Sequence, residues 1–138
     1  MDEPPRTFTM EEANALLSRV RPLIEQLQAL QRSMVETNRQ LDDAVNKVSA
    51  GNGYPIQSLK ERIQELTKHQ LQLVEAFQSA LQQLEDLGGS LKDLSVGLVD
   101  FYSLRNGELV LLCWKLGEER IQFWHTVEGG FAGRQPLE

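Results

Sequence analysis

The chain has 138 residues, which suits one domain with one hydrophobic core. Its formal net charge of -6 and its pI near 5.0 argue against unaided binding to nucleic acid or to an anionic membrane, because both carry charge of the same sign. We therefore expect small solutes or other proteins as partners.

Three features favour a cytoplasmic protein. The N-terminal residues MDEPPR lack the basic and apolar regions of a signal peptide. The longest apolar run, residues 109–114, is far too short to span a membrane. The single cysteine permits no internal disulfide, which suits a reducing compartment.

The pattern of apolar residues changes at Gly88 and Gly89, from helical spacing before them to short alternating runs after them. The expected fold class is α+β: a long antiparallel two-helix coiled-coil hairpin followed by a three-stranded antiparallel β-meander packed on it. Within a single domain over 1–138, we expect a first helix over 9–50, a second over 55–88, the meander over 91–128 and a glycine-rich C-terminal tail over 129–138.

The first helix is expected to start at Thr9, which forms a capping box with Glu12. Pro22 removes one helical hydrogen bond, so we expect a kink there, with a full break at Arg21 as the alternative. Apolar residues continue through this point in alternating steps of three and four, which is a heptad seam. The seam consists of Ala13, Leu17, Val20, Ile24, Leu27, Met34, Leu41, Val45 and Val48, with Gln31 and Asn38 filling the two remaining positions.

The second helix follows a reversal at Gly51, Asn52 and Gly53 and begins at Pro55 or Ile56. Its seam is again in heptad phase: Ile56, Leu59, Ile63, Leu66, Gln70, Leu73, Phe77, Ala80, Leu84 and Leu87. A turn centred on Asn52 pairs Val45 with Leu59, Leu41 with Ile63, Asn38 with Leu66, Met34 with Gln70 and Gln31 with Leu73.

Three consecutive layers of this hairpin would each carry one amide side chain. Polar residues in a seam commonly fix register and direction, and we favour that interpretation. The alternative is a wet, functional pocket inside the hairpin.

A helix of about 40 residues is on the order of 60 Å long, which a sheet of this size cannot cover. A bare hairpin exposes the flanks of its seam, so a second copy is expected to complete a four-helix bundle. The sequence therefore predicts a homodimer through the hairpin, with Asn38, Leu66 and Gln70 as candidate interface residues.

In the sheet, Asn106-Gly107 predicts a type I′ hairpin turn. That turn pairs Ser103 with Val110, Phe101 with Leu112, Asp100 with Cys113 and Val99 with Trp114. A second reversal over residues 117–120 is expected to pair Leu116 with Ile121, Trp114 with Phe123, Cys113 with Trp124 and Leu112 with His125.

Alternation along these strands divides the side chains between two faces. The face on the helices is expected to hold Val99, Phe101, Val110, Leu112, Trp114, Leu116, Ile121, Phe123, His125 and Val127. The other face, with Leu98, Asp100, Tyr102, Leu109, Leu111, Cys113, Lys115, Gln122, Trp124 and Thr126, is too apolar for plain solvent exposure. We expect a protein partner there, with Tyr102 and Trp124 as candidate contacts.

This register puts Cys113 and His125 on opposite faces, which argues against a nucleophile pair or a shared metal site. Cys113 is then a buried, unreactive thiol, and His125 is a hydrogen-bonded core residue. A ligand site requires a carboxylate or Arg134 to converge on His125, so the candidates are Asp100, Glu118, His125 and Arg134. His69 is expected to be solvated. Nothing in the sequence indicates a cofactor, and we find no phosphate-loop, zinc or dinucleotide motif.

The segments FTMEEANALL, SLKDLSVGLVDF, LCWKLGEERIQFWH and GFAGRQP together resemble a prokaryotic family catalogued as a domain of unknown function. The resemblance covers nearly the whole chain and implies no particular reaction, substrate or cofactor. Tyr102 departs from the family pattern by replacing a proline. The positions that match the pattern are Asp100, Cys113, Trp114, Gly117, Glu118, Trp124, His125, Gly130 and Arg134.

Two hypotheses follow from the sequence. The long seam, the two-faced sheet and the missing catalytic motifs favour a non-enzymatic, homo-oligomeric interaction or assembly module. The alternative is a protein, possibly an enzyme, that binds a small ligand or a metal around His125. Convergence of polar side chains in one concave pocket would favour the alternative.

Overall fold

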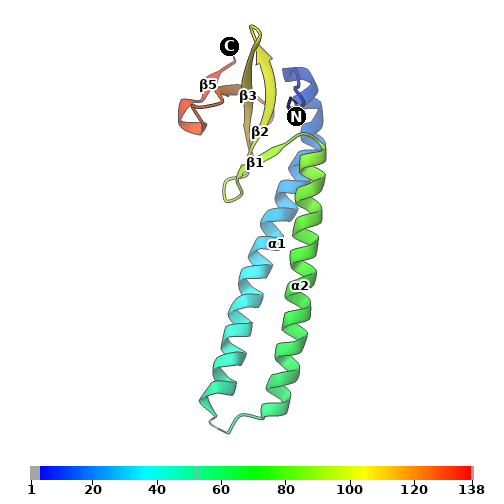
Figure 1. Cartoon of the computed structure of the whole chain (residues 1–138), viewed down its shortest axis with the longest axis vertical. Helices are drawn as coiled ribbons and strands as arrows, with labels where there is room; N and C mark the ends of the chain where they lie inside the picture. Colours follow the sequence, from blue (N-terminus) through cyan, green and yellow to red (C-terminus); the bar gives the residue numbers. More distant parts are fainter. Residues whose placement is uncertain (1–3, 52, 138) are drawn as a thin grey trace. The chain divides into compact units, whose positions relative to one another are not determined.

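The computed structural model describes residues 4–51 and 53–137. They form two compact units: the first contains residues 4–28 and 81–137, and the second contains residues 29–51 and 53–80. Helix α1 (Met10–Ala50) and helix α2 (Ile56–Asp86) pack together, as expected, and an antiparallel sheet follows them (Figure 1). Among the described residues, neither helix combines the length and apolar character that a membrane crossing needs.

The predicted capping box starts α1. The backbone N–H of Glu12 donates to Thr9 Oγ1 (3.1 Å), and the backbone N–H of Thr9 donates to Glu12 Oε1 (2.9 Å). The bond from the Thr9 N–H, together with the nearby Thr9 hydroxyl, favours the ionised carboxylate and holds the pKa of Glu12 below its ordinary value. The helix then runs through Pro22 without a break, so the alternative of a break at Arg21 is wrong.

The predicted seam of α1 is correct in part. Ala13, Leu17, Val20, Ile24 and Leu27 are buried in the first unit. In the second unit, Gln31, Asn38 and Val45 are exposed. The buried and half-buried stripe there is Leu30, Met34, Thr37, Leu41, Ala44 and Val48.

The error has a simple cause, which is that α1 carries two apolar stripes. Leu16, Val20, Leu23, Leu27 and Leu30 lead by steps of four and three into Met34 and Thr37, and all of them are buried or half-buried. Leu17 and Ile24 belong to a second stripe, and Ile24 lies beside Gly97 next to the sheet. At seven-residue spacing this second stripe continues as Gln31, Asn38 and Val45. A prediction from heptad spacing alone therefore combined residues of both α1 stripes into one seam.

The seam of α2 is as predicted from Leu59 onward, with Leu66, Ala80 and Leu84 buried. Gln70 donates its side-chain amide to the backbone carbonyl of Met34 (3.0 Å), which confirms the predicted pairing of these two positions. Because Gln31 and Asn38 are exposed, the expected run of three amide-bearing layers is wrong. The predicted reversal residue Asn52 lies outside the described residues.

The sheet has five strands in the order β1-β2-β3-β4-β5, all neighbours antiparallel: β1 (Ser90–Asp93), β2 (Leu98–Arg105), β3 (Glu108–Lys115), β4 (Phe123–Thr126) and β5 (Gln135–Pro136). The sequence predicted three strands, so β1 and β5 are additional. The expected tail folds into the short 3-10 helix η1 (Phe131–Gly133) and β5. In Figure 1 the sheet lies between the first turns of α1 (blue) and this C-terminal segment (red).

The β2–β3 register is as predicted, including the pair Asp100–Cys113, and Tyr102 pairs regularly with Leu111. Asn106 (φ 54°) and Gly107 (φ 80°) both have the positive φ angles that a type I′ turn requires.

The β3–β4 register differs from the prediction by one residue. Cys113 pairs with Phe123, Leu112 with Trp124 and Leu111 with His125. The expected pair Leu116–Ile121 does not form, because Leu116 donates to the carbonyl of Gly97 and the N–H of Ile121 donates to Asn14 Oδ1 (2.7 Å). The connection is therefore longer than a tight turn. A slip of one residue moves every side chain of β4 to the other face.

The core of the first unit contains Trp114, Phe101 and Ile121, each at most 1% exposed. Phe8 packs edge-on against Phe101, and its N–H donates to the carbonyl of Tyr102 (2.8 Å). The chain before α1 is thus fixed to the sheet by both a side chain and a backbone contact.

Gly97 offers a test of this packing, because it has a positive φ (71°) and an added Cβ would lie 2.6 Å from Leu116 Cβ. Gly107 also has a positive φ, but a Cβ added there would have nothing within 4 Å. We expect Gly107→Ala to lower the free energy of unfolding by about 1 to 2 kcal/mol through backbone strain. Gly97→Ala should cost about 1 to 3 kcal/mol more through overpacking. Urea unfolding measures both, and equal losses would contradict the close approach of Leu116.

Candidate functional site

Strands β2, β3 and β4 bring Asp100, Cys113 and His125 together on one face of the sheet. All three are buried, with exposed fractions of 2%, 0% and 2%. One ligand-type atom from each residue lies within 4.8 Å of the corresponding atoms of the other two. The expectation that Cys113 and His125 lie on opposite faces is therefore wrong, and so is the argument against a shared metal site. The one-residue slip of β4 causes both corrections.

Hydrogen bonds fix the protonation of the His125 ring. Its Nδ1 lies 2.7 Å from the backbone carbonyl oxygen of Thr126, and a carbonyl can only accept, so Nδ1 carries a proton. Its Nε2 lies 3.0 Å from Asp100 Oδ2, a distance that requires one shared proton. Asp100 Oδ1 is buried and has no hydrogen-bond partner among the described residues. Asp100 thus keeps one oxygen available within the cluster.

The thiol of Cys113 is protonated at neutral pH. Burial raises its pKa from an ordinary value of 9.0 to about 11, and the nearby carboxylate of Asp100 contributes to that shift in the same direction. The charge of Arg134 opposes this effect and lowers the pKa. Since both ring nitrogens of His125 already have other partners, His125 is not placed to deprotonate the thiol. The geometry therefore does not favour nucleophilic catalysis by Cys113.

Glu118 and Arg134 form a second polar pair next to the cluster. Arg134 donates from Nη2 to a carboxylate oxygen of Glu118 and to the carbonyl oxygen of Cys113 (3.4 Å). Its guanidinium carbon lies 3.9 Å from the centre of the Phe123 ring. The same Glu118 oxygen accepts from the N–H of Lys115 (2.8 Å). This pair fastens the C-terminal segment to the end of β3.

The four predicted site residues are thus joined by hydrogen bonds as two pairs, Asp100 with His125 and Glu118 with Arg134. Cys113 lies between the pairs, because its side chain belongs to the first and its carbonyl accepts from the second. The sequence-based prediction left Cys113 out of the site because of the assumed register of β4. The clustering of the only cysteine with a histidine inside one hairpin was the signal that could have included it.

The predicted interaction residues have separate environments. Tyr102 is half-buried on the face of the cluster, where its neighbours Asp100, Leu111 and Cys113 are buried within the chain. Trp124 is on the face toward the helices, because it pairs with Leu112, so its expected place on the second face is wrong. In the second unit, Leu66 is buried, Gln70 is half-buried and Asn38 is exposed.

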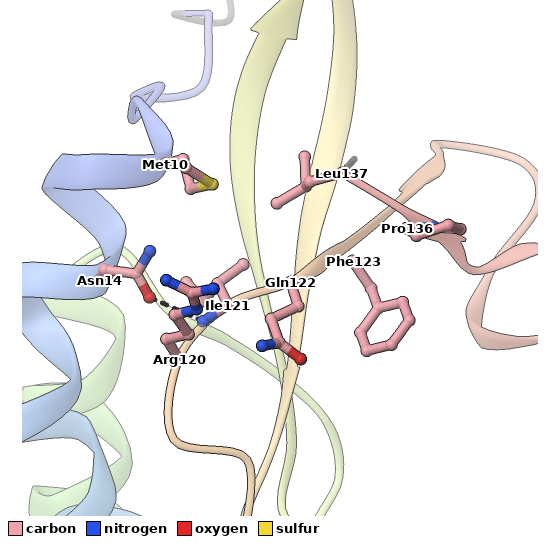
Figure 2. Close-up of a pocket in the computed structure, with 8 residues that line it drawn as sticks. All are labelled: Met10, Asn14, Arg120, Ile121, Gln122, Phe123, Pro136 and Leu137. Atoms are coloured by element: carbon pink, nitrogen blue, oxygen red, sulfur yellow. Dashed lines mark hydrogen bonds between the residues drawn. The ribbon is translucent and has the colours of Figure 1, made fainter.

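A cavity of about 430 Å³ lies beside β4, in a different place from the cluster. Figure 2 shows Met10 and Asn14 of α1 on one side of it and Pro136 and Leu137 on the other. Arg120, Ile121, Gln122 and Phe123 complete its lining, and none of the four predicted site residues takes part. The convergence of polar side chains is therefore real, but it occurs in the interior of the sheet and not in this cavity.

Comparison with known proteins identifies one family. Residues 6–137 match the family model described as "Uncharacterized conserved protein (DUF2203)". No curated protein and no solved structure matches the chain.

The raised pKa of Cys113 predicts a dependence of stability on pH. The folded state holds the thiol proton more tightly than the unfolded state, so its contribution is complete below pH 9.0 and is lost as the pH rises toward 11. We expect the free energy of unfolding of the wild type to fall by about 2 to 3 kcal/mol more than that of Cys113→Ala across this range. Urea unfolding at a series of pH values measures the difference. Parallel curves would show that the thiol has an ordinary pKa.

Proposed function

The chain belongs to the DUF2203 family, whose description names no reaction, and we propose from the buried cluster that this protein binds a divalent transition metal such as Zn²⁺. The observation that carries the proposal is the meeting of a thiol, an imidazole and a carboxylate within 4.8 Å in the protein interior. Sulfur, nitrogen and oxygen ligands of these types are those that Zn²⁺ prefers.

The spacing of the three side chains suits a tetrahedral ion after small movements. Typical bond lengths to Zn²⁺ place neighbouring ligand atoms about 3.3 to 3.7 Å apart. The present separation of His125 Nε2 and Asp100 Oδ2 is 3.0 Å, so this pair must open by a few tenths of an ångström. Asp100 Oδ1, which has no hydrogen-bond partner among the described residues, can approach the ion as the second oxygen of a bidentate carboxylate, which distorts the tetrahedron. The bond from His125 Nδ1 to Thr126 fixes the ring so that Nε2 is the ligand nitrogen.

Charge balance also supports binding. Without metal, the protonated thiol is neutral, and the Asp100–His125 pair shares one proton and is neutral as a whole. Loss of the thiol proton and of the shared proton leaves two negative charges, and a divalent ion neutralises them in an interior where a bare charge would be costly. Arg134 adds a positive charge nearby, but its pairing with Glu118 offsets that charge.

A site built in this way is closed, since its three ligand residues are at most 2% exposed. Closed sites with side-chain ligands typically stabilise a fold, whereas catalytic sites keep a position open for water or substrate. The metal would join three neighbouring strands, β2, β3 and β4. We therefore propose a structural metal and a non-enzymatic protein. A thiol ligand must remain reduced, which agrees with the proposed location in the cytoplasm.

The second proposed function is self-association as an interaction or assembly module, with α1 and α2 in coiled-coil packing. It is supported by the small number of buried residues in the second unit. Among its described residues, only Thr37, Ala44, Leu66 and Ala80 are buried, whereas Val35 and Leu71 are 66% and 58% exposed. A homodimer would cover such residues. A protein partner on the sheet near Tyr102 stays a prediction.

Metal binding can be tested with Co²⁺ as a spectroscopic substitute for Zn²⁺. We expect an intense thiolate-to-metal absorption band on addition of Co²⁺ and its loss on addition of excess Zn²⁺. Cys113→Ser should remove the band, and Asp100→Asn and His125→Leu should each weaken binding about tenfold or more. Zn²⁺ at about 100 times its dissociation constant should stabilise the wild type by about 2.7 kcal/mol.

The other histidine provides a matched control, because His69 is exposed in the second unit. His69→Gln should bind Co²⁺ like the wild type. Circular dichroism would establish that each variant is folded before titration. A folded wild type without the thiolate band, or ligand variants with unchanged affinity, would rule out this site.

The protonation scheme predicts how many protons the metal displaces. One proton should leave the thiol of Cys113 and one the hydrogen bond between Asp100 and His125, so about two protons are expected per ion at neutral pH. Calorimetric titration with Zn²⁺ in buffers of different ionisation enthalpy measures this number. Release of a single proton would show that the Asp100–His125 hydrogen bond persists in the metal complex.

A further inference from the structure

The second unit exposes more apolar surface on one flank of its helix pair than on the other. The hydrogen bond from Gln70 to the carbonyl of Met34 marks one layer of the seam. Val35 and Leu71 each follow a residue of this layer. In two antiparallel helices, the residues that follow a facing pair rotate toward the same side. Val35 and Leu71 therefore lie at the same level on one flank, at 66% and 58% exposure.

The heptad positions extend this flank along both helices. Seam positions in phase with Met34 and Gln70 recur every seven residues along each helix. The residues one and four places after each of these positions lie on the same side as Val35 and Leu71. We call this surface the apolar flank. It comprises Gln31, Val35, Asn38, Asp42, Val45 and Ser49 on α1 and Gln57, Lys60, Gln64, Thr67, Leu71, Val74 and Gln78 on α2.

The opposite flank is different in chemistry. It includes Glu36, Asp43, Lys47, Arg62 and Glu65, together with His69. Two shallow depressions confirm that these positions of α1 and α2 share a side, because one joins Asp43 and Lys47 to Arg62 and the other joins Glu36 to His69. The apolar flank has one acidic and one basic residue, Asp42 and Lys60. Depletion of charge together with exposed apolar side chains is typical of the centre of a protein interface.

We infer that the apolar flank is the surface through which two copies of this chain associate. The inference rests on the self-association proposed above and names the surface that carries it. Charge favours a second copy as the partner, because the charges of Asp42 and Lys60 sum to zero and leave no net charge on the apolar flank. Residues 29–80 contain six acidic and six basic residues, so their net charge is zero, although the chain carries -6. Two hairpins can therefore meet without the repulsion expected between whole chains.

The contact would form a four-helix bundle. Each copy supplies two helices, and the apolar flanks become the interior between the pairs. Val35 and Leu71 would be at the centre of the contact, since they are the most exposed large apolar residues of the second unit. Asn38 and the neighbouring amides would supply hydrogen bonds that fix the register of the two copies.

The test compares two double variants in the same layer of the hairpin. Val35→Glu with Leu71→Glu places two charges on the apolar flank. Ser33→Glu with His69→Glu places the same charges on the opposite flank, at residues that precede Met34 and Gln70. We expect the first pair to raise the dimer dissociation constant about 100-fold or more. The second pair should leave a dimer.

Light scattering and sedimentation at micromolar concentration measure the mass, and circular dichroism measures the helix content. A wild-type mass of 15.7 kDa throughout would overturn both self-association and its surface. A wild-type dimer that both variants weaken equally would overturn the surface and leave self-association intact. Leu66→Glu would be less decisive, because Leu66 is buried within the hairpin and its replacement unfolds the helix pair.

A cross-linking experiment covers the case in which the charged variants lose their helices. Val35→Cys should form a disulfide between copies under mild oxidation, and Ser33→Cys should not. The native Cys113 does not interfere, since it is fully buried. Equal cross-linking at the two positions, or none at Val35→Cys in a dimer, would overturn the inference.

Discussion

The polar centre of this protein depends on the number of residues between β3 and β4. A chain that enters β4 one residue earlier or later presents the opposite set of side chains to each face. Here the N–H of Ile121 is held by Asn14, and that of Leu116 by Gly97. These two bonds prevent a tight turn and determine which side chains of β4 point to each face of the sheet. His125 then points to Asp100 and Cys113, and Trp124 takes the side of Leu112.

The cluster that results is buried and has no net charge. A neutral thiol and an acid–base pair with one shared proton can be buried without a bare ion, provided that the hydrogen bonds are complete. Among the atoms of this cluster that the structure describes, Asp100 Oδ1 is without a hydrogen-bond partner. An unpaired polar atom in such a place costs free energy, and a metal ion is one means of recovering it. Arg134 and Glu118 form a self-compensating pair next to this centre and leave its balance unchanged.

The sequence predicted those features that depend on neighbouring residues. The capping box at Thr9, the turn at Asn106 and the seam of α2 each follow from a few adjacent positions. The features that depend on distant contacts were missed. The two stripes of α1 differ in what covers them, and periodicity alone cannot separate Ile24 from Leu23. The β3–β4 register depends on Asn14, which is 107 positions away from Ile121. Strands β1 and β5 are short and lack a periodic signal of their own.

The contacts of Arg134 have a consequence for exchange at the buried cluster. Arg134 donates to the carbonyl oxygen of Cys113 and to Glu118, so the C-terminal segment is fixed beside the strand that carries the thiol. If the cluster holds an ion as proposed, opening of these contacts would be one step in its release. A loaded molecule would then keep its metal longer than its equilibrium affinity alone implies.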